Sequence, residues 1–135
     1  MIRVVPVVVV IAGPPAAGKS TIAEPVAARA RRPTVHLPTD SLHTWIKSGF
    51  VLPFLPESAH QNAVIENATF AAASAYLRGG YDVILDGVLG PWVIDGLRAW
   101  AAGDGLALGY LVVRPSLDVV LRRAEERAAV RWRGG

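Results

Sequence analysis

The stretch that most constrains this chain is residues 13–20, Gly-Pro-Pro-Ala-Ala-Gly-Lys-Ser, which fit the pattern G-x-x-x-x-G-K-[ST] without a mismatch. An apolar run at 4–12 precedes it, and a helix-compatible stretch at 21–30 follows. This context predicts a strand, a tight loop and a helix, in which loop N–H groups and the positive end of the helix face a phosphate chain. The alternative is a glycine turn that contains Gly-Lys-Ser by chance. Because motif and flanks agree, we favour a phosphate loop.

The motif also predicts individual roles. Lys19 is expected to reach the β- and γ-phosphates of a nucleoside triphosphate, and the Ser20 hydroxyl to hold Mg²⁺. Gly13 and Gly18 supply backbone angles and a close approach that a Cβ would hinder. The predicted nucleotide-binding residues are Gly13, Pro14, Pro15, Ala16, Ala17, Gly18, Lys19, Ser20 and Thr21.

The first residues, Met1-Ile2-Arg3 followed by valines, have some features of a secretory signal. The cleavage region would then be the phosphate loop itself, and the apolar run is far below the ~20 residues that a membrane span requires. A continuous β-branched run is typical of a buried parallel strand. We therefore expect a central strand at 4–12 and a cytoplasmic protein without a membrane partner.

Composition excludes several other classes. The chain has 135 residues, 52% of them hydrophobic, which predicts one globular domain over 1–135 rather than a disordered chain. A formal net charge of +3 suits an anionic ligand but is too small to indicate nucleic acid. The absence of cysteine excludes disulfides, thiolate metal sites and a cysteine nucleophile.

Hydrophobic patterns and turn residues predict strands that alternate with helices. The expected strands are 4–12, 34–37, 81–85 and 106–113, and the expected helices are 18–31, 39–45, 57–78, 91–101 and 115–133. Such alternation predicts an α/β fold with a parallel sheet of about four strands flanked by helices.

Three local expectations accompany these elements. Pro25 should kink or shorten the first helix, because it removes a helical hydrogen bond. Asp40 or Ser41 is the expected N-cap of the second helix. The residues of the long third helix that are available to face the sheet are Ala63, Ile65, Phe70 and Leu77.

Two aspartates follow predicted strands. Ligands of open α/β sheets lie beyond the carboxyl ends of the strands, where the phosphate loop, Asp40 and Asp86 should meet. One carboxylate could accept the proton of an attacking hydroxyl, and the other could hold Mg²⁺. The simpler alternatives are that Asp40 only caps a helix and that Asp86 is only a turn residue before Gly87.

Histidines and aromatic residues give weaker signals. His43 could face an acceptor or be structural, whereas we interpret His36 and His60 as structural. Core packing is the favoured role, ahead of an acceptor pocket, for most of Trp45, Phe50, Phe54 and Trp92.

The arginines near the end of the chain also allow two interpretations. Arg122, Arg123 and Arg127 surround Glu125-Glu126 at spacings suited to helical ion pairs. They could equally form a basic lid that closes over a transferring phosphoryl group.

Several further segments carry a resemblance: Thr39-Asp40-Ser41-Leu42-His43, the stretch 45–50, the stretch 78–87 and the stretch 113–117. With the phosphate loop, they resemble small phosphate-loop kinases of the chloramphenicol phosphotransferase-like kind, often labelled AAA-type ATP-binding proteins. The Asp-x-Leu-His element is also similar to gluconate kinases. The resemblance spans nearly the whole chain and implies the three-layer fold of phosphate-loop NTPases, with ATP and Mg²⁺ as cofactors.

The resemblance further implies transfer of the ATP γ-phosphoryl group to a hydroxyl of a small molecule. Asp40 would be the general base, Lys19 would bind phosphate, and Ser20 and Asp86 would hold the metal. A lid arginine would correspond to Arg123 or Arg127.

The resemblance departs from the family after this last helix. Such kinases usually continue into the rest of a lid, a fifth strand and an adenine-contacting loop, whereas this sequence stops after 128–135. We therefore expect the final strand and lid elements to be missing, and an uncovered sheet edge that could pair with another chain in a homo-oligomer. A nucleotide-binding remnant without turnover and a plain ATPase remain as alternatives to a kinase, and no nucleic-acid partner is expected.

Overall fold

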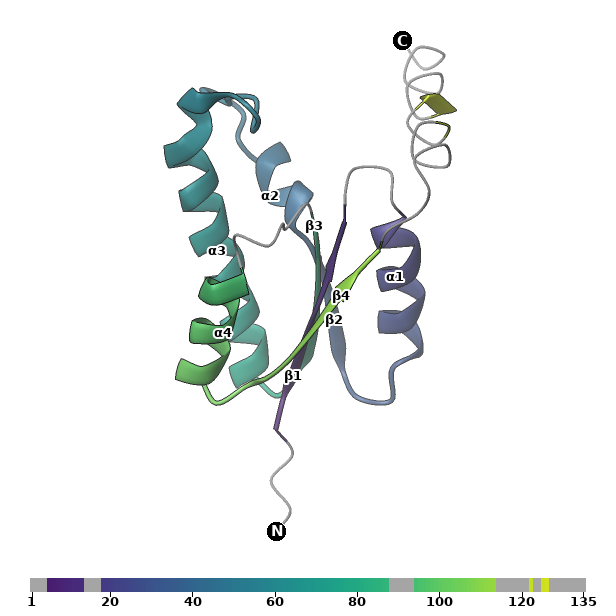
Figure 1. Cartoon of the computed structure of the whole chain (residues 1–135). Helices are drawn as coiled ribbons and strands as arrows, with labels where there is room; N and C mark the ends of the chain where they lie inside the picture. The colour runs from purple at the N-terminus through teal and green to yellow at the C-terminus, as the bar shows by residue number, and fades with distance from the viewer. Residues whose placement is uncertain (1–4, 14–17, 88–93, 114–121, 123–124, 127–135) are drawn as a thin grey trace.

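The computed structural model describes residues 5–13, 18–87, 94–113, 122 and 125–126. The elements are, in chain order, β1 (Val7–Ala12), α1 (Lys19–Arg29), β2 (Thr34–Pro38), α2 (Thr39–Thr44), a 3₁₀ turn (Pro56–Ser58), α3 (Ala59–Arg78), β3 (Asp82–Gly87), α4 (Ile94–Gly103) and β4 (Ala107–Val112). The sheet stands between α1 on one side and α2, α3 and α4 on the other (Figure 1). The predicted α/β fold of three layers is confirmed.

All four strands pair in parallel, in the order β2-β3-β1-β4. β1 therefore lies inside the sheet, between β3 and β4, as its run of valines predicted. A parallel strand with neighbours on both sides and helices on both faces is buried all round, which favours a continuous apolar sequence. The same parallel order brings the carboxyl ends of all four strands to one edge of the sheet.

The side chains of β1 alternate between two hydrophobic clusters. Val8 and Val10 point toward the side of α3 and α4, and Ile11 points toward α1. Each fully buried valine or leucine contributes roughly 1.5–3 kcal/mol by leaving water. The main cluster consists of Val8, Val10, Ala73, Leu77, Val83, Leu85 and Leu97, and the α1 side holds Ile11, Ala23 and Ile84. The phosphate-loop strand is therefore held from both faces.

Helix α3 packs through a stripe at a spacing of four residues. Ile65, Thr69, Ala73 and Leu77 are all buried. Of the positions expected to face the sheet, Ile65 and Leu77 are confirmed, but Ala63 is exposed and that expectation was wrong. Thr69 can take the buried place because its hydroxyl donates to the backbone oxygen of Ile65 at 2.8 Å.

Helix α1 continues through Pro25 and ends at Arg29, two residues before the predicted end. Pro25 lies on the exposed side of α1. The helix ends are otherwise close to the predicted ones, with Gly80 at a φ of 91° after α3. The predicted helices at 91–101 and 115–133 are described only in part, from Ile94 onward and at 122, 125 and 126.

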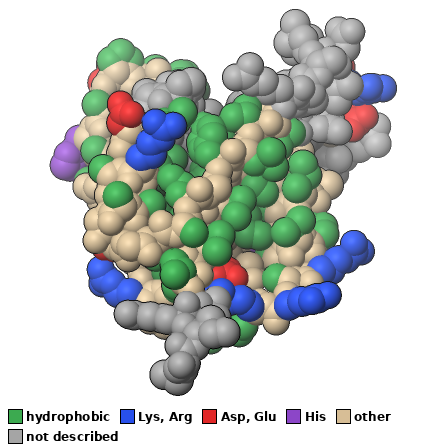
Figure 2. All heavy atoms as spheres, turned by 60° about the horizontal axis from the view of Figure 1, so that its bottom comes forward, with side chains coloured by type: hydrophobic (Ala, Val, Ile, Leu, Met, Phe, Trp, Pro, Cys, Tyr) green, Lys and Arg blue, Asp and Glu red, His purple; other side chains and the backbone are tan. Residues whose placement is uncertain are grey.

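Strand β4 forms one edge of the sheet in the part of the chain that the structure describes. Leu111 and Val112, near its end, are exposed. Figure 2 shows hydrophobic side chains gathered across the middle of this view of the molecule. Among the described helices, none combines the length and the apolar sequence that crossing a membrane requires.

Candidate functional site

The carboxyl ends of the strands line up in register. Asp86 of β3 pairs with Pro38 of β2 on one side and with Ile11 of β1 on the other. The next residues along the three strands are Gly87, Thr39 and Ala12. The end of β1, which leads to Gly13, the start of α2 and the end of β3 therefore meet at one edge, as the sequence predicted.

The start of α1 has the geometry of a phosphate-loop exit. Gly18 adopts a left-handed φ of 92°, a conformation in which a side chain would be strained, and its carbonyl oxygen accepts from Ile22 N at 3.2 Å. Lys19, the first residue of α1, is only 7% exposed. A lysine ammonium and the positive end of a helix both attract anions, and a polyphosphate carries several negative charges. Residues 14–17 lie outside the described residues, and Thr21 is exposed.

Asp86 is buried, with 3% of its surface exposed, and its Oδ2 accepts a hydrogen bond from Nε2 of His36 on β2. His36 pairs in register with Ile84, and Ile84 packs against Ala23 of α1. His36 and Asp86 therefore share the α1 face of the sheet. Sequence reasoning missed this contact, because it depends on the register in which β2 pairs with β3.

Asp40 is exposed on the first turn of α2. The expected N-cap at Asp40 or Ser41 was wrong, because α2 begins at Thr39 with Pro38 in the cap position and has no side-chain cap. The physical reason is that β2 runs directly into α2, so backbone pairing of Pro38 with Asp86 fixes where the helix starts. The capping role is thus excluded for Asp40, which leaves its carboxylate available at the strand edge.

A close contact between Thr39 and Gly87 sets the spacing of the two aspartates. A Cβ on Gly87 would overlap Oγ1 of Thr39 and would lie 3.2 Å from its Cβ. Thr39 is buried, so it has little room to move away. Asp40 follows Thr39 and Asp86 precedes Gly87, so this contact holds the two candidate acidic residues on adjoining strand ends.

Replacing Gly87 with Ala is expected to lower the free energy of unfolding by about 1–3 kcal/mol, because the added methyl overpacks the site. Unfolding in urea measures the effect. The double variant Gly87→Ala/Thr39→Ala should recover part of the lost free energy of unfolding, because Thr39→Ala removes the Oγ1 that the added methyl overlaps. Gly103→Ala is the matched control, because a Cβ there meets nothing within 4 Å. Equal stability of Gly87→Ala and wild type would contradict the contact.

The segment after α2, residues 49–56, contains no polar side chain and is nevertheless held in place. Gln61 of α3 accepts from Val51 N at 2.8 Å and donates to Val51 O at 2.7 Å. The Ser58 hydroxyl donates to Pro53 O at 2.8 Å. The backbone of this apolar loop is therefore fixed by polar side chains of the 3₁₀ turn and of the first turn of α3.

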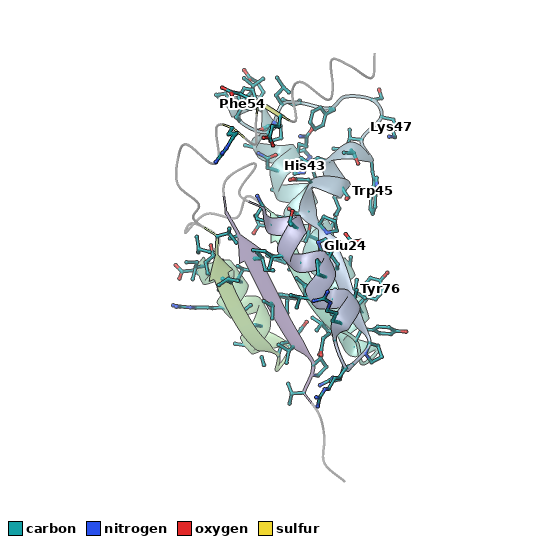
Figure 3. The ribbon with its side chains drawn as sticks, turned by 90° about the vertical axis from the view of Figure 1, so that its right-hand side faces the viewer. Glu24, His43, Trp45, Lys47, Phe54 and Tyr76 are labelled. Carbon is teal, nitrogen blue, oxygen red and sulfur yellow. The ribbon has the colours of Figure 1, made fainter. Side chains whose placement is uncertain are left out.

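The aromatic side chains of this region are exposed rather than packed in the core. Trp45, Phe50 and Phe54 are all exposed, so core packing was the wrong interpretation for them, and Trp92 lies outside the described residues. Phe50 makes an edge contact with His43 of α2, with ring centroids 6.5 Å apart. Figure 3 shows Trp45 pointing outward beyond His43 and Phe54 at the far end of the loop. Through the contact between Phe50 and His43, the apolar loop touches the helix that carries Asp40.

Of the candidate arginines near the end of the chain, the structure describes only one. Arg122 is helical and exposed, as are Glu125 and Glu126. Arg123 and Arg127, the predicted lid arginines, lie outside the described residues. The ion-pair and lid interpretations both stay predictions.

The side chains at the strand edge can be compared with the ligands that a Mg²⁺ site requires. Among the described residues, no group of three or more His, Asp or Glu side chains could form a protein-only metal cage. Mg²⁺ in phosphoryl-transfer sites is commonly held by one or two protein oxygens together with substrate phosphates and water. The buried Asp86 carboxylate at the strand edge, with the hydroxyl that the sequence places at Ser20, fits such a shared site.

Comparisons with known proteins agree with this fold. The "Pnkp1/Rnl/Hen1 complex" contains a chain of similar structure, with a TM-score of 0.75 and 16% identity over 91% of this chain, which spans 40% of that one. A protein from Chloroflexus aurantiacus, provisionally described as a kinase, has a TM-score of 0.75 and 20% identity. The match covers 93% of this chain and 67% of the Chloroflexus chain. A gluconokinase from Sinorhizobium meliloti has a TM-score of 0.57 and 22% identity. The match covers 94% of this chain and 68% of the gluconokinase chain. At such identities these likenesses show the fold.

No curated protein matched the sequence. A family model described as an AAA domain matches residues 8–133. The matched range includes the phosphate loop, both aspartates and the strand edge that unites them. This protein therefore belongs to the AAA domain family.

Proposed function

We propose that the protein transfers the γ-phosphoryl group of ATP to a hydroxyl of a small molecule, with Asp40 as general base. The observation that carries the proposal is the buried Lys19 at the start of α1, together with Asp86 at the end of β3 and Asp40 just after β2. A cation buried at a helix N-terminus suits a polyphosphate. The exposed carboxylate of Asp40 suits an acceptor that arrives from solvent.

The phosphate-binding half of the site comes from residues 13–21. Loop N–H groups and the positive end of α1 would hold the β- and γ-phosphates, and Lys19 would neutralise part of their charge. Ser20 and Asp86 would hold Mg²⁺, which supplies charge neutralisation at the transferring group. Arg123 and Arg127 would close over that group as a basic lid.

Asp40 would act on the acceptor. Its carboxylate takes the proton of the acceptor hydroxyl as the acceptor oxygen forms a bond to the γ-phosphorus. The bond between that phosphorus and the β–γ bridging oxygen breaks, and ADP leaves with the bridging oxygen. Direct support is the exposure of Asp40 and the absence of a capping bond on its side chain.

The apolar loop at 49–56 would form the acceptor side of the site. It follows the helix that carries Asp40, its backbone is held by Ser58 and Gln61, and Phe50 reaches His43. Because this loop is already fixed, less conformational entropy is lost when a ligand binds to it.

Phe50→Ser is therefore expected to raise the KM for the acceptor roughly tenfold, which corresponds to the loss of one aromatic contact with the bound acceptor of about 1.4 kcal/mol. The KM for ATP should stay unchanged. Tyr76→Ser is the matched control, because Tyr76 and Phe50 are both 44% exposed and Tyr76 lies near the other end of α3 (Figure 3). Steady-state kinetics decide, and a change in both KM values would count against an acceptor role of the loop.

The test of the whole proposal is transfer of labelled γ-phosphate from Mg·ATP to a panel of sugars, nucleosides and hydroxyl-bearing antibiotics. Labelled acceptor is the expected product. ATP binding without any labelled product would favour a remnant without turnover. Fast release of free phosphate without an acceptor would favour a plain ATPase.

The edge strand β4 supports a proposal about assembly. Among the described residues no strand pairs with β4 on the side away from β1, and Leu111 and Val112 near its end are exposed. An exposed apolar edge strand favours pairing with another strand. A homodimer through β4 would cover it, and sedimentation of the purified chain tests that association.

A further inference from the structure

The side chain of His36 connects three elements that build the candidate site. It extends from β2, is 12% exposed, and donates from Nε2 to the Asp86 carboxylate at the end of β3. Its Nδ1 lies 3.6 Å from Oε2 of Glu24 on α1, the helix that begins with Lys19. Figure 3 shows Glu24 on α1, below the level of His43 in that view.

We propose that His36 is a positioning residue that holds the Asp86 carboxylate in the orientation needed to carry Mg²⁺ or a water bound to it. This inference rests on the metal role of Asp86 in the proposed function. A carboxylate accepts only, so the proton of this hydrogen bond belongs to His36 Nε2. That bond engages Oδ2 and restrains the rotation of the carboxylate group, and so its orientation at the strand edge.

The proposed role agrees with how metal sites are generally supported. Carboxylates that hold a metal are themselves hydrogen-bonded, and loss of such a partner typically weakens metal affinity about 10–100-fold. Asp86 is buried with 3% exposure, so a partner cannot be replaced easily by bulk water. His36 is the neighbouring-strand group that the structure places on this carboxylate.

The two contacts of His36 differ in weight. The Glu24 side chain is 78% exposed and lies beyond hydrogen-bond distance, so solvent screens its interaction with the imidazole. The contact with the buried Asp86 dominates. Removal of the Glu24 charge by Glu24→Gln should therefore change metal affinity less than twofold, about the scale of an exposed ion pair.

The experiment compares ATP binding in EDTA with binding of Mn²⁺ to the protein–ATP complex, by calorimetry and by the electron spin resonance signal of free Mn²⁺. His36→Leu removes the donor at similar volume, and the expected result is about 10–100-fold weaker Mn²⁺ binding. ATP affinity in EDTA should stay within about twofold. A merely structural histidine would not separate the two affinities in this way.

His36→Gln tests rescue, because the Gln amide nitrogen can take the place of Nε2 and should recover most of the Mn²⁺ affinity. If His36→Leu does not fold, His36→Asn replaces it, since its shorter amide cannot reach as far. His60→Gln is the control, as His60 is exposed near the start of α3. Unchanged Mn²⁺ affinity in a folded His36→Leu protein would overturn the inference.

The outcomes also separate this inference from the proposed function. Wild-type protein that binds ATP in EDTA but gains no Mn²⁺ site would overturn the role of His36 and leave nucleotide binding in place. Wild-type protein that binds no ATP in either condition would refute the proposed function, and the positioning role with it. Equal losses of ATP and Mn²⁺ affinity in His36→Leu would assign His36 to the fold.

Discussion

Asp40→Asn is expected to lower phosphoryl transfer to the acceptor about 10²–10⁴-fold, the range that a positioned general base usually contributes. The amide keeps the size of the side chain but cannot accept the proton of the hydroxyl. Because Asp40 is exposed and does not cap α2, the substitution should leave stability and ATP affinity close to those of wild type. The loss should therefore appear in kcat rather than in the KM for ATP.

Single-turnover transfer of labelled γ-phosphate measures this effect on an acceptor that wild-type protein phosphorylates. Asp95→Asn is the control, because Asp95 is also an exposed aspartate in the first turn of a helix, α4. A tenfold or smaller loss for Asp40→Asn would reject Asp40 as the base. A large loss for both variants would indicate a general effect of charge.

Much of the fold could be predicted because strong local patterns determine it. The valine run of β1 is too continuous for a half-exposed strand, and the glycines and lysine that follow restrict the next turn. Alternation of strands and helices then leaves few arrangements. The ends of α3 and β4 came within two residues of the predicted positions, which is the usual uncertainty of helix and strand ends.

The contacts between strand ends could not be predicted, because they depend on register. The sequence predicts only a structural role for His36, yet its side chain binds Asp86, because β2 pairs with β3 so that His36 lies opposite Ile84. The Thr39–Gly87 contact arises from the same pairing. A shift of one residue would turn His36 to the other face. Sequence spacing within each segment contains no information about that register.

The exposed aromatic loop shows a second limit. Aromatic residues are usually buried, which favoured core packing for Trp45, Phe50 and Phe54. Whether they are buried depends on how the backbone of the loop is held. Here Gln61 and Ser58 bind its backbone groups, which fixes the loop without requiring its side chains to enter the core.

Lys19→Met is the second variant with a large expected effect, since it keeps most of the buried side chain and removes its charge. ATP binding should weaken roughly 10²-fold, because a hydrogen bond to a charged group contributes about 1.5–3 kcal/mol and 1.4 kcal/mol corresponds to a factor of ten. Calorimetric titration with Mg·ATP measures the affinity. Thermal unfolding without ligand verifies that the variant is folded.

Lys47→Met is the matched control, because Lys47 is exposed and its Nζ donates only to the Thr44 carbonyl oxygen at 2.9 Å among the interactions of the described residues. It should leave ATP affinity unchanged. A folded Lys19→Met protein with wild-type affinity would show that the buried lysine serves the fold and not the phosphates. Loss of binding in Lys19→Met alone would place the nucleotide at the start of α1, where Asp86 and Asp40 could act on it.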